Sequence, residues 1–263
     1  MSLSHTLRFA RTLLATNFKA TLMLRGAFVM QAAFMALNNV TFFVFWWLLL
    51  RRVPDVGGWH LADIQVLFGV VAAAFGLTIT IAGGVRHLGR FISEGELDTL
   101  LAQPKPVLLH ALGMRSQPSG TGDMLSGIAF IILSGQLSWH NAPLVVLAVL
   151  ASAATFVACG VMFSGLAFWM GDVETLARQL WELTITFALY PEPLFGGVLR
   201  LLLFTALPAG IVGYVPARVV RTSSWPLAGA LAVAAAAYLV VAIGMFDRGL
   251  KRYTSGSRFA MFG

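Results

Sequence analysis

The sequence predicts an all-α, polytopic membrane protein with six transmembrane helices. Of its 263 residues, 58% are hydrophobic and only 11% are charged, whereas a soluble globular domain carries roughly 25% charged residues. This number of charged residues is too small to cover a water-exposed surface. The composition therefore excludes a soluble enzyme and a disordered chain. Five apolar stretches without a charged residue are candidates for the helices of about 20 residues that cross a bilayer.

The chain begins with an amphipathic segment, and we expect residues 1–25 to form a helix at the membrane interface. On a helical wheel, four apolar side chains share one side and three basic ones lie beside them: Leu3, Leu7, Leu14 and Phe18, with Arg8, Arg11 and Lys19. Such a helix lies in the interface plane, with its apolar face toward the acyl chains of the membrane lipids. Residues 26–263 are then one six-span domain, because the longest polar stretch covers only residues 86–123.

Five of the six crossings can be placed from apolar runs alone. They are Gly26–Leu50, Ile64–Val85, Met124–Ser138, Ala142–Gly171 and Pro226–Phe246. The third run is short for a bilayer span, so we expect its helix to extend back toward Gly120.

The remaining crossing lies between Asp172 and Ser224, where four prolines interrupt an apolar region. In one interpretation, Leu176–Tyr190 crosses the membrane, and Leu194–Val215 re-enters the outer leaflet with a break at Pro208. In the other, Leu199–Val215 crosses and Val173–Tyr190 lies along the inner surface. Both interpretations give six crossings, and the residues themselves leave the choice open.

The distribution of lysine and arginine predicts the orientation. With six crossings and both termini in the cytoplasm, thirteen of the 18 basic residues fall on the inner side and five on the outer side. This asymmetry is the one that the positive-inside rule requires. The net charge of +7 is therefore explained by topological anchors, and no nucleic-acid partner is expected.

No catalytic, cofactor-binding or metal-binding motif is present in the sequence. A phosphate-binding loop needs Gly-Lys followed by Ser or Thr, and none of the three lysines, Lys19, Lys105 and Lys251, follows a glycine. The chain has no His-Glu-x-x-His motif and a single cysteine, Cys159. We therefore expect any ATP-driven work to be done by a partner protein.

Three polar residues stand out inside candidate spans. Asn38 and Asn39 lie in the middle of the first crossing, and Glu182 is the only acid within a candidate span. Polar groups at this depth either hydrogen-bond to a neighbouring helix or line a functional pathway. We interpret all three as possible pathway or dimer contacts, with internal pairing as the alternative.

The loop between the second and third spans contains a short helical pattern. Leu97, Leu100 and Leu101 have the i, i+3, i+4 spacing of one helical face, and prolines at 104 and 106 end the pattern. Three acids cluster at its start: Glu94, Glu96 and Asp98. The pattern predicts a short helix that exposes a leucine face and an acidic rim to the cytosol, where it would dock onto a partner. The alternative is that the leucines pack back onto the bundle or lipid.

Three pieces of the sequence together resemble a known family. They are Glu94-Gly95-Glu96-Leu97-Asp98-Thr99-Leu100-Leu101 followed by Pro104, then Tyr190-Pro191 with Leu199-Arg200 and Pro208, and the tail from Arg248 to Tyr253. With the spacing of the spans, the chain resembles the permease subunits of type-2 export transporters of the ATP-binding-cassette (ABC) class. The resemblance is closest to a bacterial subfamily of paired permeases.

The resemblance implies six spans, an interfacial N-terminal helix and re-entrant helices before the last span, which favours the first placement above. It also implies a cytosolic coupling helix within the 86–123 loop that docks into a separate ABC ATPase. The coupling residues would be Glu94, Gly95, Glu96, Leu97, Asp98, Leu100 and Leu101. Two ATPases and a second permease, either another copy or a paralogue, would complete a transporter in the bacterial plasma membrane.

Two other functions compete with export. A membrane-embedded lipid-modifying enzyme would need a catalytic acid cluster or a histidine pair inside the bilayer, and the sequence contains neither. A structural membrane subunit without a transport role would need no such groups. We expect a permease that is not itself an enzyme, with ATP hydrolysis on a partner ATPase subunit.

Overall fold

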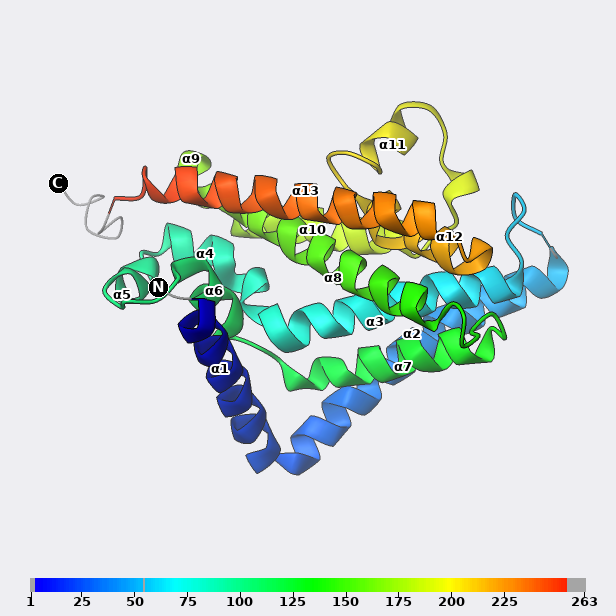
Figure 1. Ribbon diagram of the computed structural model, residues 1–263, viewed down its shortest axis with the longest axis horizontal. Helices are drawn as coiled ribbons and strands as arrows, with labels where there is room; N and C mark the ends of the chain where they lie inside the picture. Colours follow the sequence, from blue (N-terminus) through cyan, green and yellow to red (C-terminus); the bar gives the residue numbers. More distant parts are fainter. Residues whose placement is uncertain (1–2, 54, 255–263) are drawn as a thin grey trace.

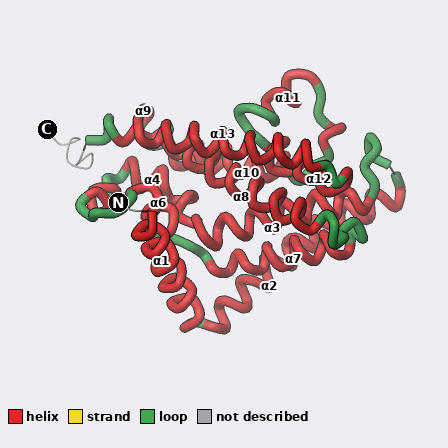
Figure 2. Tube along the Cα trace, viewed as in Figure 1, coloured by secondary structure: helices red, strands yellow, loops and turns green. Residues whose placement is uncertain are grey.

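The computed structural model describes residues 3–53 and 55–254, and it is built from helices joined by short loops (Figures 1 and 2). No strand occurs among these residues, apart from an isolated bridge between Val56 and Trp59. The all-α prediction is therefore confirmed for the described chain. Arg258 lies outside the described residues, as do the side chains of Leu3 and Leu7.

Four of the described helices are long and apolar enough to cross a membrane. They are α2 (Arg25–Arg52), α3 (Leu61–Ala82), α8 (Ala142–Gly165) and α13 (Trp225–Leu250). Each covers most of a predicted span. The third predicted span corresponds to α7 (Thr121–Leu133), which begins before Met124 as expected but has only 13 residues.

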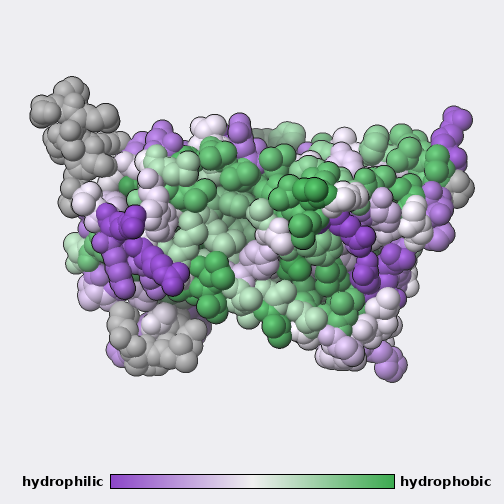
Figure 3. Space-filling view, turned by 90° about the horizontal axis from the view of Figure 1, so that it is seen from above, coloured by the Kyte–Doolittle hydropathy of each residue, from purple (hydrophilic) through white to green (hydrophobic). Residues whose placement is uncertain are grey.

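The long helices run side by side along the longest axis of the molecule (Figure 1). Helix α3 is almost entirely buried at the centre, where it packs against α7, α8 and α2. Helix α13 packs against the other side of α8, and α2 is largely exposed. Figure 3 shows hydrophobic residues over the middle of one face and hydrophilic residues toward its two ends, which is the distribution of a membrane-embedded body.

Loops gather at the two ends of the bundle (Figure 2). One end carries α4 (Leu88–Ser93), α5 (Leu97–Leu101) and α6 (Val107–Gly113), and we call it the α5 end. At the opposite end, which we call the α12 end, α12 (Val215–Thr222) finishes and α13 begins.

The N-terminal helix, α1 (Leu3–Met23), lies across the bundle axis instead of along it (Figure 1). It is held against α6 by a hydrogen bond of 2.7 Å from the Asn17 side-chain amide to the Gly113 carbonyl. The ring of Phe9 meets that of His110 edge to face, with centroids 5.2 Å apart. The predicted N-terminal helix is therefore present, and it is docked onto the α5 end.

The chain between α10 (Glu174–Ala188) and α13 is broken into short pieces. These are η3 (Glu192–Leu194), α11 (Gly197–Leu202), the π-helical turn η4 (Gly210–Tyr214) and α12. The alternative that made 199–215 a continuous span is therefore wrong, because α11 ends before Pro208 and helical structure resumes only at Gly210. Proline removes a backbone donor and so interrupts a helix here.

The broken segment turns back at mid-depth of the bundle. The hydroxyl of Tyr238, which lies midway along α13, donates to the carbonyls of Phe204 and Thr205 at 3.2 and 2.7 Å. After this point the chain returns to the α12 end, where Arg221 reaches the carbonyl of Gly58. The segment therefore enters and leaves from the same end of the molecule.

Helices α3 and α7 approach closely because both contact faces carry small residues. A Cβ atom added to Gly127 of α7 would lie 2.5 Å from both the Ala73 nitrogen and the Gly69 carbonyl oxygen of α3. Small residues allow backbones to approach in this way, which gives dispersion contacts that partly replace the hydrophobic driving force missing inside a bilayer.

We predict that Gly127→Ala lowers the free energy of unfolding by about 1–3 kcal/mol, because the new methyl group overlaps backbone atoms that cannot rotate away. The matched control is Gly229→Ala in α13, where an added Cβ meets nothing within 4 Å. This control should be neutral or slightly stabilising. Denaturant unfolding of the purified protein in detergent measures both, and equal midpoints for the two variants would contradict the close packing.

Candidate functional site

The predicted coupling segment forms the tip of the α5 end (Figure 1). Helix α3 continues through the 3₁₀ turn η1 (Gly83–His87) into α4, and a tight turn then leads into α5. Gly95 makes that turn possible, because its φ of +79° is a conformation that other residues rarely adopt. The chain therefore leaves the buried central helix through η1 and α4 and reverses at Gly95 into the short helix α5.

The three leucines of α5 do not share one environment. Leu97 and Leu100 are 0% and 4% exposed and belong to the apolar core of the chain, whereas Leu101 is 43% exposed. The prediction of a fully exposed leucine face is therefore wrong for Leu97 and Leu100, and the alternative that they pack back onto the bundle is correct for these two. Fully burying a leucine stabilises a fold by about 1.5–3 kcal/mol, which is enough to hold a helix as short as α5 against the bundle.

The acids of the segment lie half-buried along its flank. The Glu96 carboxylate is 3.9 Å from the Arg90 Nε atom in α4. The Asp98 carboxylate lies close to the hydroxyl of Tyr253, and burial together with this negative charge raises the pKa of Tyr253 to about 12. The Tyr253 ring also meets Phe168 edge to face. The tail that follows α13 therefore packs back beside α5.

The surface of α5 that remains accessible is small and mostly uncharged. Thr99, Leu101, Ala102 and Pro104 are exposed, while Glu94, Gly95, Glu96 and Asp98 are half-buried beside them. Helix α5 thus has one side anchored in the core and one side open at the end of the molecule.

The two asparagines of the first span behave differently. The Asn39 amide in α2 donates to the Asp123 carboxylate at 2.7 Å and to the Ser126 hydroxyl at 2.8 Å, so it bonds to the neighbouring helix α7. Asn38 is exposed, and together with Asn39 it lines a cavity of about 420 Å³ between α2, α3, α7 and α10. Asn39 therefore pairs with a neighbouring helix, and both asparagines line the cavity.

Glu182 lies on the exposed side of α10, outside the residues that line this cavity. Its neighbours on the same side, Arg178 and Gln179, are also exposed. Among the ion pairs of the described residues, none includes Glu182. The structure therefore leaves a polar stripe on the surface of α10.

Two buried carboxylates at the α12 end were not singled out from the sequence. Glu192, just after the break at Pro191, pairs with Arg200 of α11 and with Arg218 of α12, the latter at 2.6 Å. Both guanidinium groups are about half-exposed. One acid therefore ties together the pieces of the broken segment.

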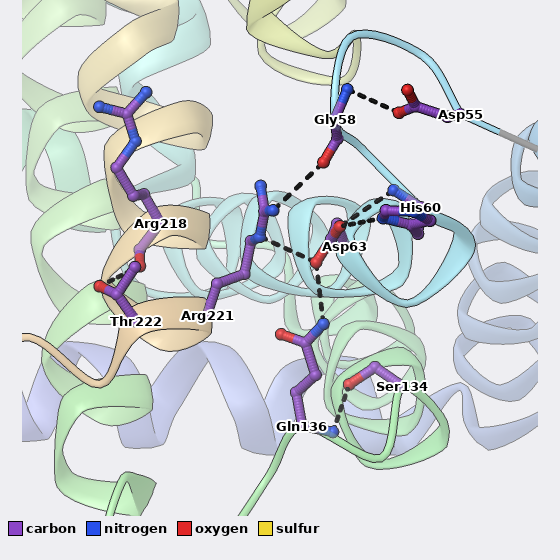
Figure 4. Close-up of polar contacts among 9 residues, drawn as sticks. All are labelled: Asp55, Gly58, His60, Asp63, Ser134, Gln136, Arg218, Arg221 and Thr222. Carbon is purple, nitrogen blue, oxygen red and sulfur yellow. Dashed lines mark hydrogen bonds and ion pairs between the residues drawn. The ribbon is translucent and has the colours of Figure 1, made fainter.

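The second carboxylate, Asp63 in the first turn of α3, joins three parts of the chain (Figure 4). It accepts from Arg221 at 2.8 Å, from the Gln136 amide at 2.9 Å and from the backbone N–H of His60 at 2.9 Å. Arg221 also lies over the ring of Trp59, 5.0 Å from its centroid. This network fastens α12 and the loop after α7 to the start of α3.

These features define a multi-pass membrane protein with apolar helices, charged networks at the α12 end and a docked short helix at the other end. The chain belongs to the ABC-2 family of transporters, because a family model described as ABC-2 family transporter protein matches residues 36–257. Family membership points to a transporter and not to an enzyme, as the resemblance of the sequence predicted. Searches of the curated proteins and of the solved structures find no match.

We predict that Asp98→Asn lowers the pKa of Tyr253 from about 12 toward the ordinary value near 10, because the neighbouring negative charge is removed while burial remains. In the folded protein the raised pKa favours neutral tyrosine, so this contact stabilises the fold below about pH 10 and loses its contribution as the pH rises toward 12. Tyrosinate absorbance, taken as the difference from Tyr253→Phe, measures the shift. Glu96→Gln should leave the titration in place, and an unchanged pKa in Asp98→Asn would contradict the contact.

Proposed function

We propose that the chain is the membrane-spanning permease subunit of an ATP-driven exporter whose ATPase is a separate protein. Membership of the ABC-2 transporter family supports this proposal, because the chain carries no phosphate-binding loop of its own. The observation that carries it is the two-sided environment of α5, which is anchored by Leu97 and Leu100 and open at Leu101.

The proposed topology has six crossings. Besides the four long helices, α7 and α10 are assigned as the third and fifth spans, although they have only 13 and 15 residues. Both pack along buried helices of the bundle, so their short length is compensated by neighbouring protein. The segment between α10 and α13 is assigned as re-entrant, because irregular backbone at this depth survives only where protein satisfies its polar groups.

The proposed orientation places the α5 end in the cytoplasm of a bacterial cell, with both termini inside. The basic residues near that end support this assignment: Arg86, Arg90, Lys105 and Arg115, followed by Arg248, Lys251 and Arg252. Helix α1 would then lie at the inner interface, with Arg8 and Arg11 exposed toward lipid headgroups.

The proposed coupling runs from α5 into the central helix. An ATPase that contacts Leu101 and the rim formed by Glu94, Gly95, Glu96 and Asp98 would push on a helix whose other side is fixed in the core. The push would pass through α4 and η1 into α3, which is buried among α2, α7 and α8. Packed cores transmit such displacements because they resist compression.

A second permease, either another copy or a paralogue, is proposed to cover the surface of α2 and α10. Helix α2 is mostly exposed, and α10 presents Glu182 on its open side. An acid that faces lipid at the centre of a span is disfavoured by roughly 2.5–3.5 kcal/mol on insertion scales. Asn38 and Glu182 would therefore face the partner or the pathway between the two permeases.

We predict that Leu101→Asp weakens binding of the proposed partner ABC ATPase by about 30-fold, because an exposed apolar contact worth about 2 kcal/mol is replaced by a charge. Affinity purification after co-expression, together with ATPase activity in detergent, measures the loss. Met170→Asp, at another exposed apolar site of the same end, is the control and should bind normally.

Leu100→Asp should instead reduce the amount of folded permease, because it places a charge in the core. This difference separates loss of docking from loss of folding. Full ATPase binding by folded Leu101→Asp, or no binding by the unaltered permease, would contradict the proposed coupling.

We further predict that, where the second permease is another copy of this chain, cysteine at position 182 forms permease–permease cross-links in membranes. The background is Cys159→Ser, which removes the buried native thiol, and the substitution is Glu182→Cys with a short bifunctional maleimide. Val233→Cys, on the exposed side of α13, is the matched control and should stay monomeric. Cross-linking at position 233 but not at position 182 would contradict the proposal and place the permease interface on α13 instead of α10.

A further inference from the structure

The cavity between α2, α3, α7 and α10 has apolar walls and one polar edge. Its volume is about 420 Å³, large enough for a small organic molecule. Four phenylalanines contribute to the walls: Phe34, Phe42, Phe68 and Phe75. The polar edge consists of Asn38, Asn39, Asp123 and Thr186.

Asp123 is the exceptional member of this edge. Three acids of the described chain are buried, namely Asp63, Asp123 and Glu192. Asp63 and Glu192 each pair with arginine at the α12 end. No ion pair within the described chain includes Asp123, whose carboxylate accepts from the uncharged Asn39 amide.

The burial of Asp123 makes a purely structural role expensive. This residue lies in the first turn of α7, packed beside Gly76 of α3, and is only 5% exposed. An acid at the first turn of a helix gains about 0.3–1 kcal/mol from the helix dipole. Burying an ionised group without a charged partner costs several times more, so such residues are functional candidates whose partner has to be identified.

The surroundings of the carboxylate indicate the chemistry of that partner. Phenylalanine ring faces attract cations within about 6 Å of their centroids, and the carboxylate repels anions. No group of three His, Cys, Asp or Glu suited to a metal ion occurs in the described part of the chain. An organic cation with an apolar body matches both the charge and the walls.

We propose that this cavity binds a lipophilic organic cation, with Asp123 as its counter-ion and the phenylalanine rings as its apolar walls. The site names a substrate class for the proposed exporter and in that sense rests on the proposed function. Binding itself requires only the permease. The amide of Asn39 holds the carboxylate toward the cavity edge, and Asn38 and Thr186 offer polar contacts to the rest of the ligand.

The test uses two probes of nearly the same shape and opposite charge, tetraphenylphosphonium and tetraphenylborate. Equilibrium dialysis against the purified full-length permease in nanodiscs, without any ATPase, measures both dissociation constants. We expect saturable binding of the phosphonium, and weakening by about tenfold or more in Asp123→Asn, which corresponds to 1.4 kcal/mol or more. Asp172→Asn, which removes the same charge from an exposed site, should bind as the unaltered protein does.

Two comparisons keep the result interpretable. Asp123→Asn preserves the shape of the side chain, and its unfolding midpoint checks that the fold persists. If that variant does not fold, Ala72→Phe fills the cavity and leaves the carboxylate in place, and it should abolish phosphonium binding.

Unchanged phosphonium binding in folded Asp123→Asn would overturn the proposal, as would equal binding of tetraphenylborate or retained binding in Ala72→Phe. Because no ATPase is present, these outcomes are independent of the coupling experiment at Leu101. Loss of ATPase binding with intact phosphonium binding would remove the proposed transport mechanism and leave the cation site standing.

Discussion

The absence of water inside a bilayer is the constraint on which this structure depends. A polar group at that depth is stable only if the chain supplies its hydrogen-bond partner. Trp181 of α10 donates to the Phe156 carbonyl of α8 at 3.1 Å, and Tyr214 of η4 donates to the Phe187 carbonyl at 2.6 Å. The first bond joins α10 to α8 and the second joins η4 to α10, so the same contacts satisfy polar groups and hold the helices together.

The same apolar packing continues beyond the long spans into the α5 end. Helix α5 has only five residues and would not be stable by itself. It persists because Leu97 and Leu100 are inserted into a core that is continuous with α3 and α8. A force applied at Leu101 therefore acts on a part of the bundle and not on a flexible loop, which is the physical basis of the coupling that we propose.

Much of the architecture could be predicted from the sequence. Apolar runs without charges located α2, α3, α8 and α13, and the spacing of leucines located α5. That spacing identified a shared face but did not show whether the face points inward. The residues that surround Leu97 and Leu100 in the core are distant from them in the sequence. Only Leu101 turned out to be exposed.

The charged groups inside the bundle were harder to find. Asp123 precedes the uncharged run by one residue, and although the helix was expected to extend back toward Gly120, nothing in the sequence showed that this carboxylate would be buried. Glu192 pairs with arginines 8 and 26 residues away in a proline-broken stretch, where no helical periodicity relates the three. A single acid has no pattern, so its role becomes visible only when the packing brings its neighbours together.

The central claim is that α5 is anchored on one side and open on the other at the cytoplasmic end. Cysteine labelling in inside-out membrane vesicles tests it most directly, with Leu100→Cys and Leu101→Cys each made in the Cys159→Ser background. The account predicts that a membrane-impermeant maleimide labels position 101 rapidly and position 100 slowly if at all. Equal labelling at both positions, or labelling of position 101 only in right-side-out vesicles, would contradict it.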